Sequence, residues 1–312
     1  MQKIFVFGSI NVDLVISAKR LPKLGESLKG HGFMTTQGGK GANQAVACKK
    51  LGARKVMFLG AIGKDLFGSQ LKNSLQNFGV DVSMLKTHEN SNSGVCFIVL
   101  DECRKDNYLI VDGGANDLVR FCDYADVLDQ NAAEGDIFLS QLEISADAVK
   151  EGLAFAKRKK MYTVLNPAPA IKIGPDFLKN VDLLVLNETE TEIISGIPLK
   201  TDKDLLNAGR FFITEGVKEA VITLGAKGSC YYNGKKFIKI AAKKVNAVDT
   251  TSAGDTFIGA LALKKALGEN IEDSLEFASA CSAITVSRKG AAVSIPTKEE
   301  AEAIMCSNYG YR

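Results

Sequence analysis

The stretch Ala247-Val248-Asp249-Thr250-Thr251-Ser252-Ala253-Gly254-Asp255-Thr256-Phe257 places two carboxylates on either side of a run of small residues. The second carboxylate, Asp255, opens an apolar pattern that continues to Leu267 and predicts a helix. The first amides of a helix have no intrahelical partner and the helix dipole makes that end positive, so it can bind an anion. A carboxylate beside an anion site suits a step in which a substrate loses a proton. The alternative is that Asp255 only caps the helix and that the small residues form a tight turn.

The composition of the chain is that of an ordinary globular protein. With 312 residues and a net charge of +3, it gives no reason to expect a nucleic acid or an anionic membrane as a partner. No apolar run approaches the roughly 20 residues that span a bilayer, and Asp13 interrupts the N-terminal run before a secretory signal could form. We therefore expect a cytoplasmic protein.

Cysteine and histidine usage limits the possible chemistry. The seven cysteines are odd in number and form no Cys-x-x-Cys pair, which favours free thiols over disulfides or zinc. The two histidines, His31 and His88, are isolated from any triad or metal-ligand pattern. Catalysis must then depend on carboxylates, lysines and backbone amides.

Short apolar runs alternate with helical patterns along most of the chain. Strands are predicted near 3–7, 56–60, 137–141, 162–165, 183–186 and 220–224, and helices near 42–51, 67–78, 146–157, 205–214, 253–267, 271–288 and 297–306. Such repeated units predict a mostly parallel sheet with helices on both faces. Residues 13–37 and 94–111 alternate over shorter runs, and we expect them to pair as a lid. No linker divides the chain, so a single domain over residues 1–312 is expected.

Polar clusters lie at the ends of several predicted strands, where open α/β sheets bind their ligands. One runs from Gly8 to Asp13, and another, Gln37-Gly38-Gly39-Lys40-Gly41-Ala42-Asn43, precedes the first helix. The second cluster is neither a Walker A loop nor a dinucleotide motif, but its glycines allow a ligand to approach the backbone closely. Asn11, Asp13 and Glu143 have the acceptors and donors of a polyol site. Taken alone, each of them is better explained as a turn or edge-strand residue.

Two further clusters follow later strands. Asn187 and Glu190 of the first one lie on one face of a helical turn, where the acid either caps the helix or orients hydrated magnesium. The second, Thr223-Leu224-Gly225-Ala226-Lys227-Gly228, is either a plain hairpin or a loop that holds nucleotide phosphates through Thr223 and the backbone.

In their order and combination, these motifs resemble those of the ribokinase family of carbohydrate kinases. The resemblance rests on Gly-Ser-Ile-Asn-Val-Asp (8–13), Gly-Gly-Lys-Gly-Ala-Asn-Gln-Ala (38–45), Asn-Pro-Ala-Pro (166–169), Asn-Glu-Thr-Glu (187–190) and Asp-Thr-x-x-Ala-Gly-Asp-Thr-Phe (249–257). It implies a three-layer α/β/α fold with a small β-sheet lid and ATP-dependent phosphorylation of ribose at its 5-hydroxyl. The alternatives are a kinase for another small sugar or nucleoside, such as deoxyribose or fructose, and a non-catalytic sugar-binding regulator.

The resemblance also implies roles for individual residues. Asp255 would be the general base, and the amides of Ala253 and Gly254 would form an anion hole with its own. Ribose would contact Asn11, Asp13, Gly39, Lys40, Gly41, Asn43, Glu143 and Asp255. ATP would contact Asn187, Thr223, Leu224, Gly225, Ala226, Lys227, Gly228 and Gly254.

Two cations and a second copy of the chain are implied as partners. Magnesium would accompany ATP, with Glu190 ordering it through water. Potassium would act as a monovalent activator beside the anion hole, although Thr250-Thr251-Ser252 is more polar than the insert usual in the family. Its expected ligands are Asp249, Thr251, Thr285, Arg288, Gly290 and Ser294. A homodimer would form through the lid sheet.

Overall fold

A nine-stranded sheet forms the centre of the protein, with strand order β13-β12-β11-β10-β9-β8-β1-β4-β5. The computed structural model describes residues 2–104 and 106–309, with only the backbone of residues 306–309. The strands from β11 through β1 to β5 in this order run parallel to one another. β12 and β13 extend the sheet beyond β11 in antiparallel orientation. The strands are β1 (Ile4–Phe7), β4 (Val56–Gly63), β5 (Leu85–His88), β8 (Ile137–Gln141), β9 (Tyr162–Asn166), β10 (Leu183–Asn187), β11 (Glu219–Thr223), β12 (Ser229–Tyr232) and β13 (Phe237–Ile240).

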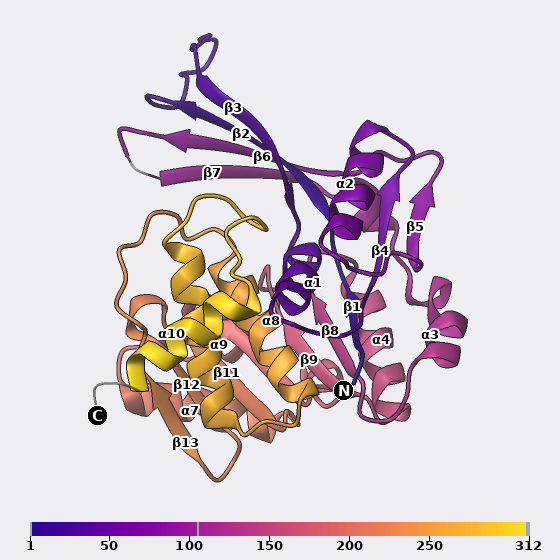
Figure 1. Cartoon of the computed structure of the whole chain (residues 1–312), viewed down its shortest axis with the longest axis vertical. Coiled ribbons are helices and arrows are strands. Elements are labelled where there is room, and N and C mark those ends of the chain that lie inside the picture. Colours follow the sequence, from indigo (N-terminus) through magenta and orange to yellow (C-terminus); the bar gives the residue numbers. More distant parts are fainter. Residues whose placement is uncertain (1, 105, 310–312) are drawn as a thin grey trace.

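Helices cover both faces of this sheet (Figure 1). Alternate residues of β1 belong to two separate cores, because Ile4 and Val6 pack on one face and Phe5 and Phe7 on the other. The first face carries α1 (Lys40–Lys50), α2 (Leu66–Asn77), α8 (Ala253–Ala266), α9 (Ile271–Val286) and α10 (Lys298–Tyr309). The second carries α3 (Ala125–Asn131), α4 (Ala146–Arg158), α5 (Pro175–Leu178), α6 (Glu188–Ser195) and α7 (Asp202–Thr214). The predicted three-layer α/β/α fold is thus confirmed.

A second, four-stranded sheet stands above the carboxyl edge of the large one (Figure 1). Its order is β3-β2-β6-β7, with β2 (Asn11–Ala18), β3 (His31–Gly38), β6 (Gly94–Asp101) and β7 (Asp106–Asp112). We call it the lid sheet. It begins two residues earlier than the predicted 13–37, so Asn11 itself is part of the lid.

Some elements were not predicted from the sequence. The edge strands β5 and β13 and the helices α3 and α5 have four to seven residues each. Elements of this length contain too few residues to establish a period, so the pattern of apolar side chains does not reveal them.

The cysteines are free thiols, as expected, wherever their side chains are described. Cys48, Cys96, Cys230 and Cys281 are buried, whereas Cys103 and Cys122 are exposed. The side chain of Cys306 lies outside the described part of the chain. Among residues 2–104 and 106–309, no helix is both long and apolar enough to cross a membrane.

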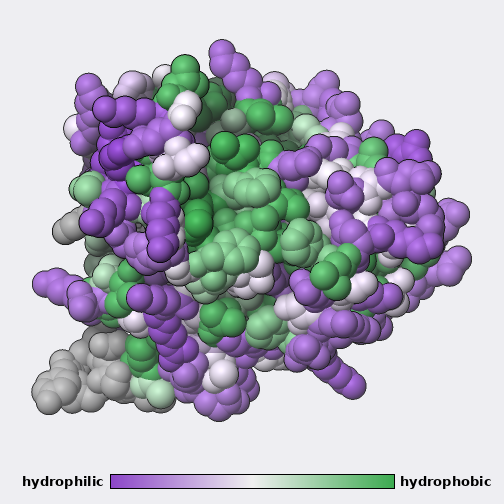
Figure 2. All heavy atoms as spheres, turned by 90° about the horizontal axis from the view of Figure 1, so that it is seen from above, coloured by the Kyte–Doolittle hydropathy of each residue, from purple (hydrophilic) through white to green (hydrophobic). Residues whose placement is uncertain are grey.

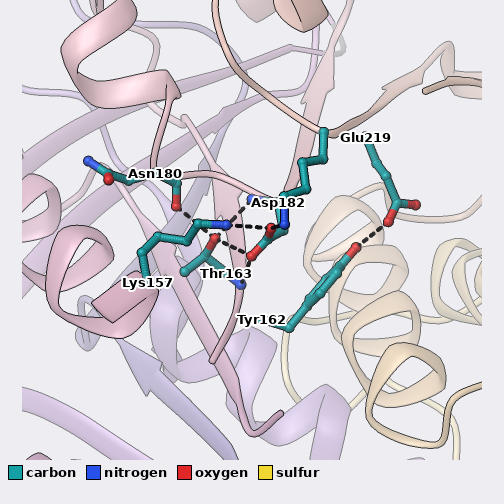
Figure 3. Close-up of polar contacts among 7 residues, drawn as sticks. Lys157, Tyr162, Thr163, Asn180, Asp182 and Glu219 are labelled. Atoms are coloured by element: carbon teal, nitrogen blue, oxygen red, sulfur yellow. Dashed lines mark hydrogen bonds and ion pairs between the residues drawn. The ribbon is translucent and has the colours of Figure 1, made fainter. Parts of the chain in front are cut away.

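A network of hydrogen bonds and ion pairs surrounds the buried Asp182 at the amino edge of the large sheet (Figure 3). Its Oδ1 accepts from the ammonium groups of Lys157 at 2.6 Å and Lys218 at 2.8 Å. Its Oδ2 accepts from the amide and the hydroxyl of Thr163, both at 3.0 Å. Beside it, the hydroxyl of Tyr162 donates to Glu219 at 2.8 Å. Every oxygen of Asp182 is therefore paired, which is the condition under which a buried carboxylate is tolerated.

We predict that Asp182→Ala lowers the free energy of unfolding by about 2 to 4 kcal/mol, because it leaves the Thr163 amide and two ammonium groups without their acceptor. Glu134→Ala is the matched control, since its ion pair with Lys160 lies between two side chains that are each 71% exposed. Exposed pairs contribute about 0 to 1 kcal/mol. Denaturant unfolding measures both variants, and equal losses would contradict the prediction.

Candidate active site

Helix α8 begins at Ala253, directly after Ser252, whose φ of 59° lies in the left-handed region. The amide of Ala253 donates to the carbonyl of Thr250 at 3.2 Å, and that of Thr256 donates to Ser252 at 2.8 Å. The amides of Gly254 and Asp255 have no acceptor among the described residues. A Cβ on Gly254 would meet no atom from elsewhere in the chain within 4 Å. Two unpaired donors at the positive end of a helix thus face open space.

The carboxylate of Asp255 is 8% exposed and bonds to side chains of α1 instead of capping its own helix. Its Oδ1 accepts from Gln44 Nε2 at 3.0 Å, and its Oδ2 accepts from Asn43 Nδ2 at 3.3 Å. Burial raises the pKa of Asp255, and the charge of Lys40 and the two amide donors oppose this effect. The helix-cap interpretation of Asp255 is therefore wrong, since the carboxylate makes no bond to the free amides of α8.

Glycines at the end of β3 admit the carboxylate of Asp13. A Cβ on Gly38 would lie 2.1 Å from Asp13 Oδ1. Gly39 has a φ of 87°, and a Cβ there would lie 2.7 Å from the Cα of Ile10. Only glycine fits at these positions, because β3 passes so close to the start of β2.

The predicted sugar residues are brought together between the lid sheet and α1. Asn11, Asp13 and Asn43 are 4%, 8% and 6% exposed. Glu143 is fixed through its Oε2, which accepts from the Ser9 hydroxyl at 2.6 Å and the Lys40 amide at 2.9 Å. The Oδ1 of Asn43 is buried and has no partner among the described residues. A buried acceptor without a partner is a place where a ligand hydroxyl or a water could donate.

The charges in this region are strongly coupled. Burial, together with the nearby Glu143 and Asp255, raises the pKa of Asp13 to about 7. Burial by itself lowers the pKa of Lys40, but the carboxylates of Asp255, Glu143 and Glu190 outweigh it, so that the pKa lies above its ordinary value. One half-buried ammonium group is thus close to three acids, and it remains charged at neutral pH.

The residues expected to contact a nucleotide lie on neighbouring strands. Asn187 and Thr223 are direct partners in the register of β10 and β11. The 3₁₀ turn Gly225–Lys227 (η3) then leads into β12, so the segment is a hairpin. Gly228 has a φ of 103°, and a Cβ there would lie 1.9 Å from the carbonyl oxygen of Ile240. The turn exposes its backbone at the same sheet edge as Asp255, although the hairpin alone does not require a nucleotide.

Glu190 forms a capping box with Asn187 at the start of α6. The amide of Asn187 donates to Glu190 Oε2 at 2.8 Å, and the amide of Glu190 donates to Asn187 Oδ1 at 2.8 Å. Burial raises the pKa of Glu190, while the Asn187 amide and the charge of Lys40 oppose it and Asp255 adds to it. The capping role is therefore real, and the carboxylate also faces the charged centre.

The residues predicted to hold potassium are only partly brought together. Asp249 Oδ1 accepts from the amide and the hydroxyl of Thr251, and its Oδ2 accepts from the Gly290 amide at 2.9 Å. The side chains of the other three point to different partners: Thr285 to Thr256, Ser294 to the Ala291 carbonyl, and Arg288 to Glu300. Within the described part of the chain, no three His, Cys, Asp or Glu residues form a group that could hold a metal. Any cation here would depend on carbonyl oxygens and Asp249.

Four residues that support the site were not assigned from the sequence. Ser9 orients Glu143, and Asn116 donates to Asn11 Oδ1 at 2.8 Å. Gln44 and Gln141 form a chain of amides behind Asp255. Ser9 and Gln44 stand inside the recognised motifs and were within reach of the sequence. Asn116 lies in an isolated 3₁₀ turn, where no sequence signal points to it.

Comparison with known proteins agrees with this geometry. The chain matches the model of the pfkB family of carbohydrate kinases over residues 1–298. It is 41% identical to a ribokinase of Schizosaccharomyces pombe, with 97% of both chains covered, and 33% identical to a deoxyribokinase of Salmonella typhi, with 95% and 96% covered. The solved structure of Arabidopsis thaliana ribokinase complexed with ribose and ATP matches with a TM-score of 0.90 at 30% identity, covering 97% of this chain and 98% of that one. Since motifs, fold and sequence agree over nearly the whole length, the chain belongs to the pfkB family of carbohydrate kinases.

Proposed function

We propose that this protein transfers the γ-phosphoryl group of ATP to the 5-hydroxyl of ribose, giving ribose 5-phosphate and ADP. The observation that carries the proposal is the buried carboxylate of Asp255 beside the unpaired amides of Gly254 and Asp255 at the start of α8. The relatives add support, because the S. pombe protein is a ribokinase and the A. thaliana structure holds ribose and ATP.

In this reaction Asp255 acts as the general base. The sugar oxygen attacks the γ-phosphorus, the bond from that phosphorus to the bridging oxygen breaks, ADP leaves, and the hydroxyl proton passes to Asp255. A carboxylate whose pKa is raised by burial is a stronger base than one in water. The amides of Gly254 and Asp255 stabilise the charge that develops on the phosphoryl oxygens. The amide of Ala253 joins this anion hole only if it leaves the Thr250 carbonyl.

The sugar lies between the lid sheet and α1. Asn43 Oδ1 is the orphaned acceptor that a sugar hydroxyl would satisfy. Glu143 keeps Oε1 for a second hydroxyl, since Oε2 is already bonded to Ser9 and the Lys40 amide. We assign the sugar contacts to Asn11, Asp13, Gly39, Lys40, Gly41, Asn43 and Glu143.

ATP lies along the exposed backbone of the β11–β12 turn, with its γ-phosphate toward α8. We assign it to Asn187, Thr223, Leu224, Gly225, Ala226, Lys227, Gly228 and Gly254. Magnesium accompanies the phosphates in hydrated form, as it usually does in phosphoryl transfer. Glu190 is the acid that would order this hydration shell, because it is electrostatically coupled to both Lys40 and Asp255.

A potassium ion beside the anion hole is a further part of the proposal. Asp249 ties the loop before α8 to Gly290, so a cation bound here would steady that loop. The other ligands would be oxygens of Thr251, Thr285, Arg288, Gly290 and Ser294, mainly from the backbone. Carbonyl and carboxylate oxygens suit such a hard cation.

A homodimer through the lid sheet is the proposed assembly. Asp13 faces the site. Leu14 pairs with Phe97, and Phe97 pairs with Ile110, so these three side chains lie on the opposite face of the lid sheet. Leu14 packs against the core, which leaves Phe97 and Ile110 open to a partner. Phe33, Phe97 and Ile110 are 64%, 50% and 73% exposed. Figure 2, which looks down on the lid, shows an apolar area ringed by hydrophilic residues. We call Phe33, Phe97 and Ile110 the outer lid patch. A second copy of the chain would cover it, because large exposed apolar areas usually mark an interface.

Two other functions remain as alternatives. The similarity to a deoxyribokinase favours deoxyribose as a second candidate sugar, and fructose or a nucleoside is a more distant one. A sugar that lacks one hydroxyl leaves a buried polar group unpaired, at a cost of about 1 to 3 kcal/mol. A non-catalytic sugar-binding regulator would have no need of a base at Asp255.

The substrate is tested by ADP release with ribose, deoxyribose, fructose and adenosine at equal concentrations. We expect the highest kcat/KM with ribose. A higher kcat/KM with deoxyribose than with ribose would make deoxyribose the assigned substrate. No ADP release with any of the four, together with intact ATP binding, would favour the non-catalytic regulator.

The catalytic centre is tested with Asp255→Asn and Gly254→Ala. Removing the base should lower kcat at least about 10²-fold while ATP binding persists. Gly254→Ala should lower kcat at least about tenfold because its methyl group enters the anion hole. It should leave thermal stability equal or higher, since alanine favours a helix by up to about 1 kcal/mol. A loss under tenfold for Asp255→Asn would remove it from the role of base.

We expect potassium chloride to raise kcat relative to tetramethylammonium chloride at the same ionic strength. Asp249→Asn should reduce this activation, because it weakens the charge that faces the cation. Equal rates in the two salts would reject the potassium site.

We expect sedimentation velocity to give twice the chain mass for the wild type and the chain mass for Phe97→Asp. Val127→Asp is the control, since Val127 is 41% exposed but lies on α3, away from the lid. A wild type that sediments as a single chain at micromolar concentration would reject the lid interface.

A further inference from the structure

The side-chain amide of Gln44 on α1 joins the carboxylate of Asp255 to the interior of the large sheet. Its Nε2 donates to Asp255 Oδ1 at 3.0 Å and to Asn166 Oδ1 at 3.2 Å. Its Oε1 accepts from Gln141 Nε2 at 2.6 Å. Gln44 and Gln141 are fully buried and Asn166 is 5% exposed. Little water competes for these bonds, so the geometry of the amides is set by the protein alone.

The direction of every bond in this chain follows from one backbone carbonyl. Asn166 Nδ2 donates to the carbonyl of Val185 at 3.1 Å, and a carbonyl can only accept. Because Nδ2 of Asn166 points to Val185, the atom of Asn166 that faces Gln44 is Oδ1. Oδ1 can only accept, so Gln44 must present its Nε2 to it. With Nε2 of Gln44 so placed, its second hydrogen points to Asp255 Oδ1. A flipped Gln44 would set its oxygen against two other oxygens, so only this orientation pairs both ends of the Gln44 amide. At the far end of the chain, Gln141 Oε1 has no partner among the described residues.

Two glycines allow this arrangement. A Cβ on Gly8 would lie 2.1 Å from Gln141 Oε1, so the end of β1 has to be glycine for Gln141 to reach Gln44. A Cβ on Gly259, one turn after Asp255, would lie 2.5 Å from the Cβ of Ala47. The close packing of α1 on α8 that this permits is what brings Gln44 to the carboxylate.

We propose that Gln44 is a positioning residue that keeps Asp255 Oδ1 permanently in the role of acceptor and so leaves Oδ2 as the oxygen that takes the proton from the sugar. This proposal rests on the proposed function, in which Asp255 is the base. Oδ2 has a single protein partner, Asn43 Nδ2, at the longer distance of 3.3 Å. Asn43 also carries the unpaired Oδ1, so Oδ2 lies on the side where the sugar is expected.

The charged groups around Asp255 also influence its pKa. Lys40 on α1 favours the ionised carboxylate, and Glu143 after β8 opposes it. Asp13 on the lid and Glu190 on α6 are coupled to Asp255 as well. The Gln44 donor works with Lys40 to lower a pKa that burial raises. Its removal should therefore raise the pKa of Asp255, and the sugar would be deprotonated only at higher pH.

The first test is Gln44→Met, which keeps the volume and removes the donor. The titration of Asp255 is followed by NMR of protein with ¹³C-labelled aspartate carboxyl groups, and its signal is identified by its loss in Asp255→Asn. We expect the pKa of Asp255 to rise by about one unit, the scale of one hydrogen bond to a charged group. Because the carboxylate loses the donor that orients it, the single-turnover rate should fall about 10- to 100-fold even on the pH plateau. The acid limb of the rate should move to higher pH by the same one unit, and KM for sugar and ATP should change less than about threefold.

Two other variants separate positioning from folding. Val46→Ala removes a fully buried side chain of the same helix outside the amide chain, so it should lower stability without moving the pH profile. Gln44→Glu keeps the shape and sets a second carboxyl group against Oδ1, so the two acids should titrate as a pair with an apparent pKa above that of the wild type.

The outcomes distinguish this proposal from the proposed function. An unchanged Asp255 titration in both Gln44 variants would overturn the positioning role, and so would a lower rate with an unmoved acid limb. A wild type that phosphorylates none of the sugars would overturn the function alone, because the NMR titration needs no turnover.

Discussion

The burial of one ionisable carboxylate, Asp255, at the start of α8 is the constraint to which the rest of the site is adapted. An isolated buried charge costs several kcal/mol. Here the positive end of α8, the Lys40 ammonium and the amides of Asn43 and Gln44 offset that cost. Three of these contributions come from α1, which must therefore pack directly on α8. Glycine at Gly259 permits the contact, and the glycines before α1 let the chain turn from the lid into that helix.

The lid sheet places a second buried acid, Asp13, close enough to Asp255 for their charges to interact. Asp13 comes down from β2 toward Glu143 and Asp255, and its pKa of about 7 reflects burial first and the two neighbouring acids second. Ionised Asp13 is unfavourable in the protein alone, and sugar hydroxyls that donate to it would relieve this. If Asp13 contacts the sugar as proposed, sugar binding would change the charge of the site through this one strand.

Polar groups are hydrogen-bonded at the amino edge of the large sheet, whereas several at its carboxyl edge have no partner among the described residues. At the amino edge, both oxygens of Asp182 are paired, and Glu219 accepts from Tyr162, Tyr231 and Lys265. At the carboxyl edge, Asn43 Oδ1, the Ser252 hydroxyl and the amides of Gly254 and Asp255 are left open. Satisfied networks stabilise a fold, whereas unsatisfied groups lower stability unless a ligand completes them. The carboxyl edge is therefore where function is expected.

The sequence by itself determined the layer architecture, because the 3.6-residue period of helices such as α4 and the short, wholly apolar runs of buried strands such as β1 are strong local signals. It also identified Asp255, Asn43 and Lys40 through motifs whose residue types already suit the chemistry. It left open whether Asp255 caps a helix, and it did not reveal the contribution of Asn116. Those points depend on which distant segments meet, and only the packing of α1 on α8 and of the turn Gly114–Leu118 on β4 and β6 decides that. The same packing made Gln44, one polar residue in a helix, a hydrogen-bond donor to the Asp255 carboxylate.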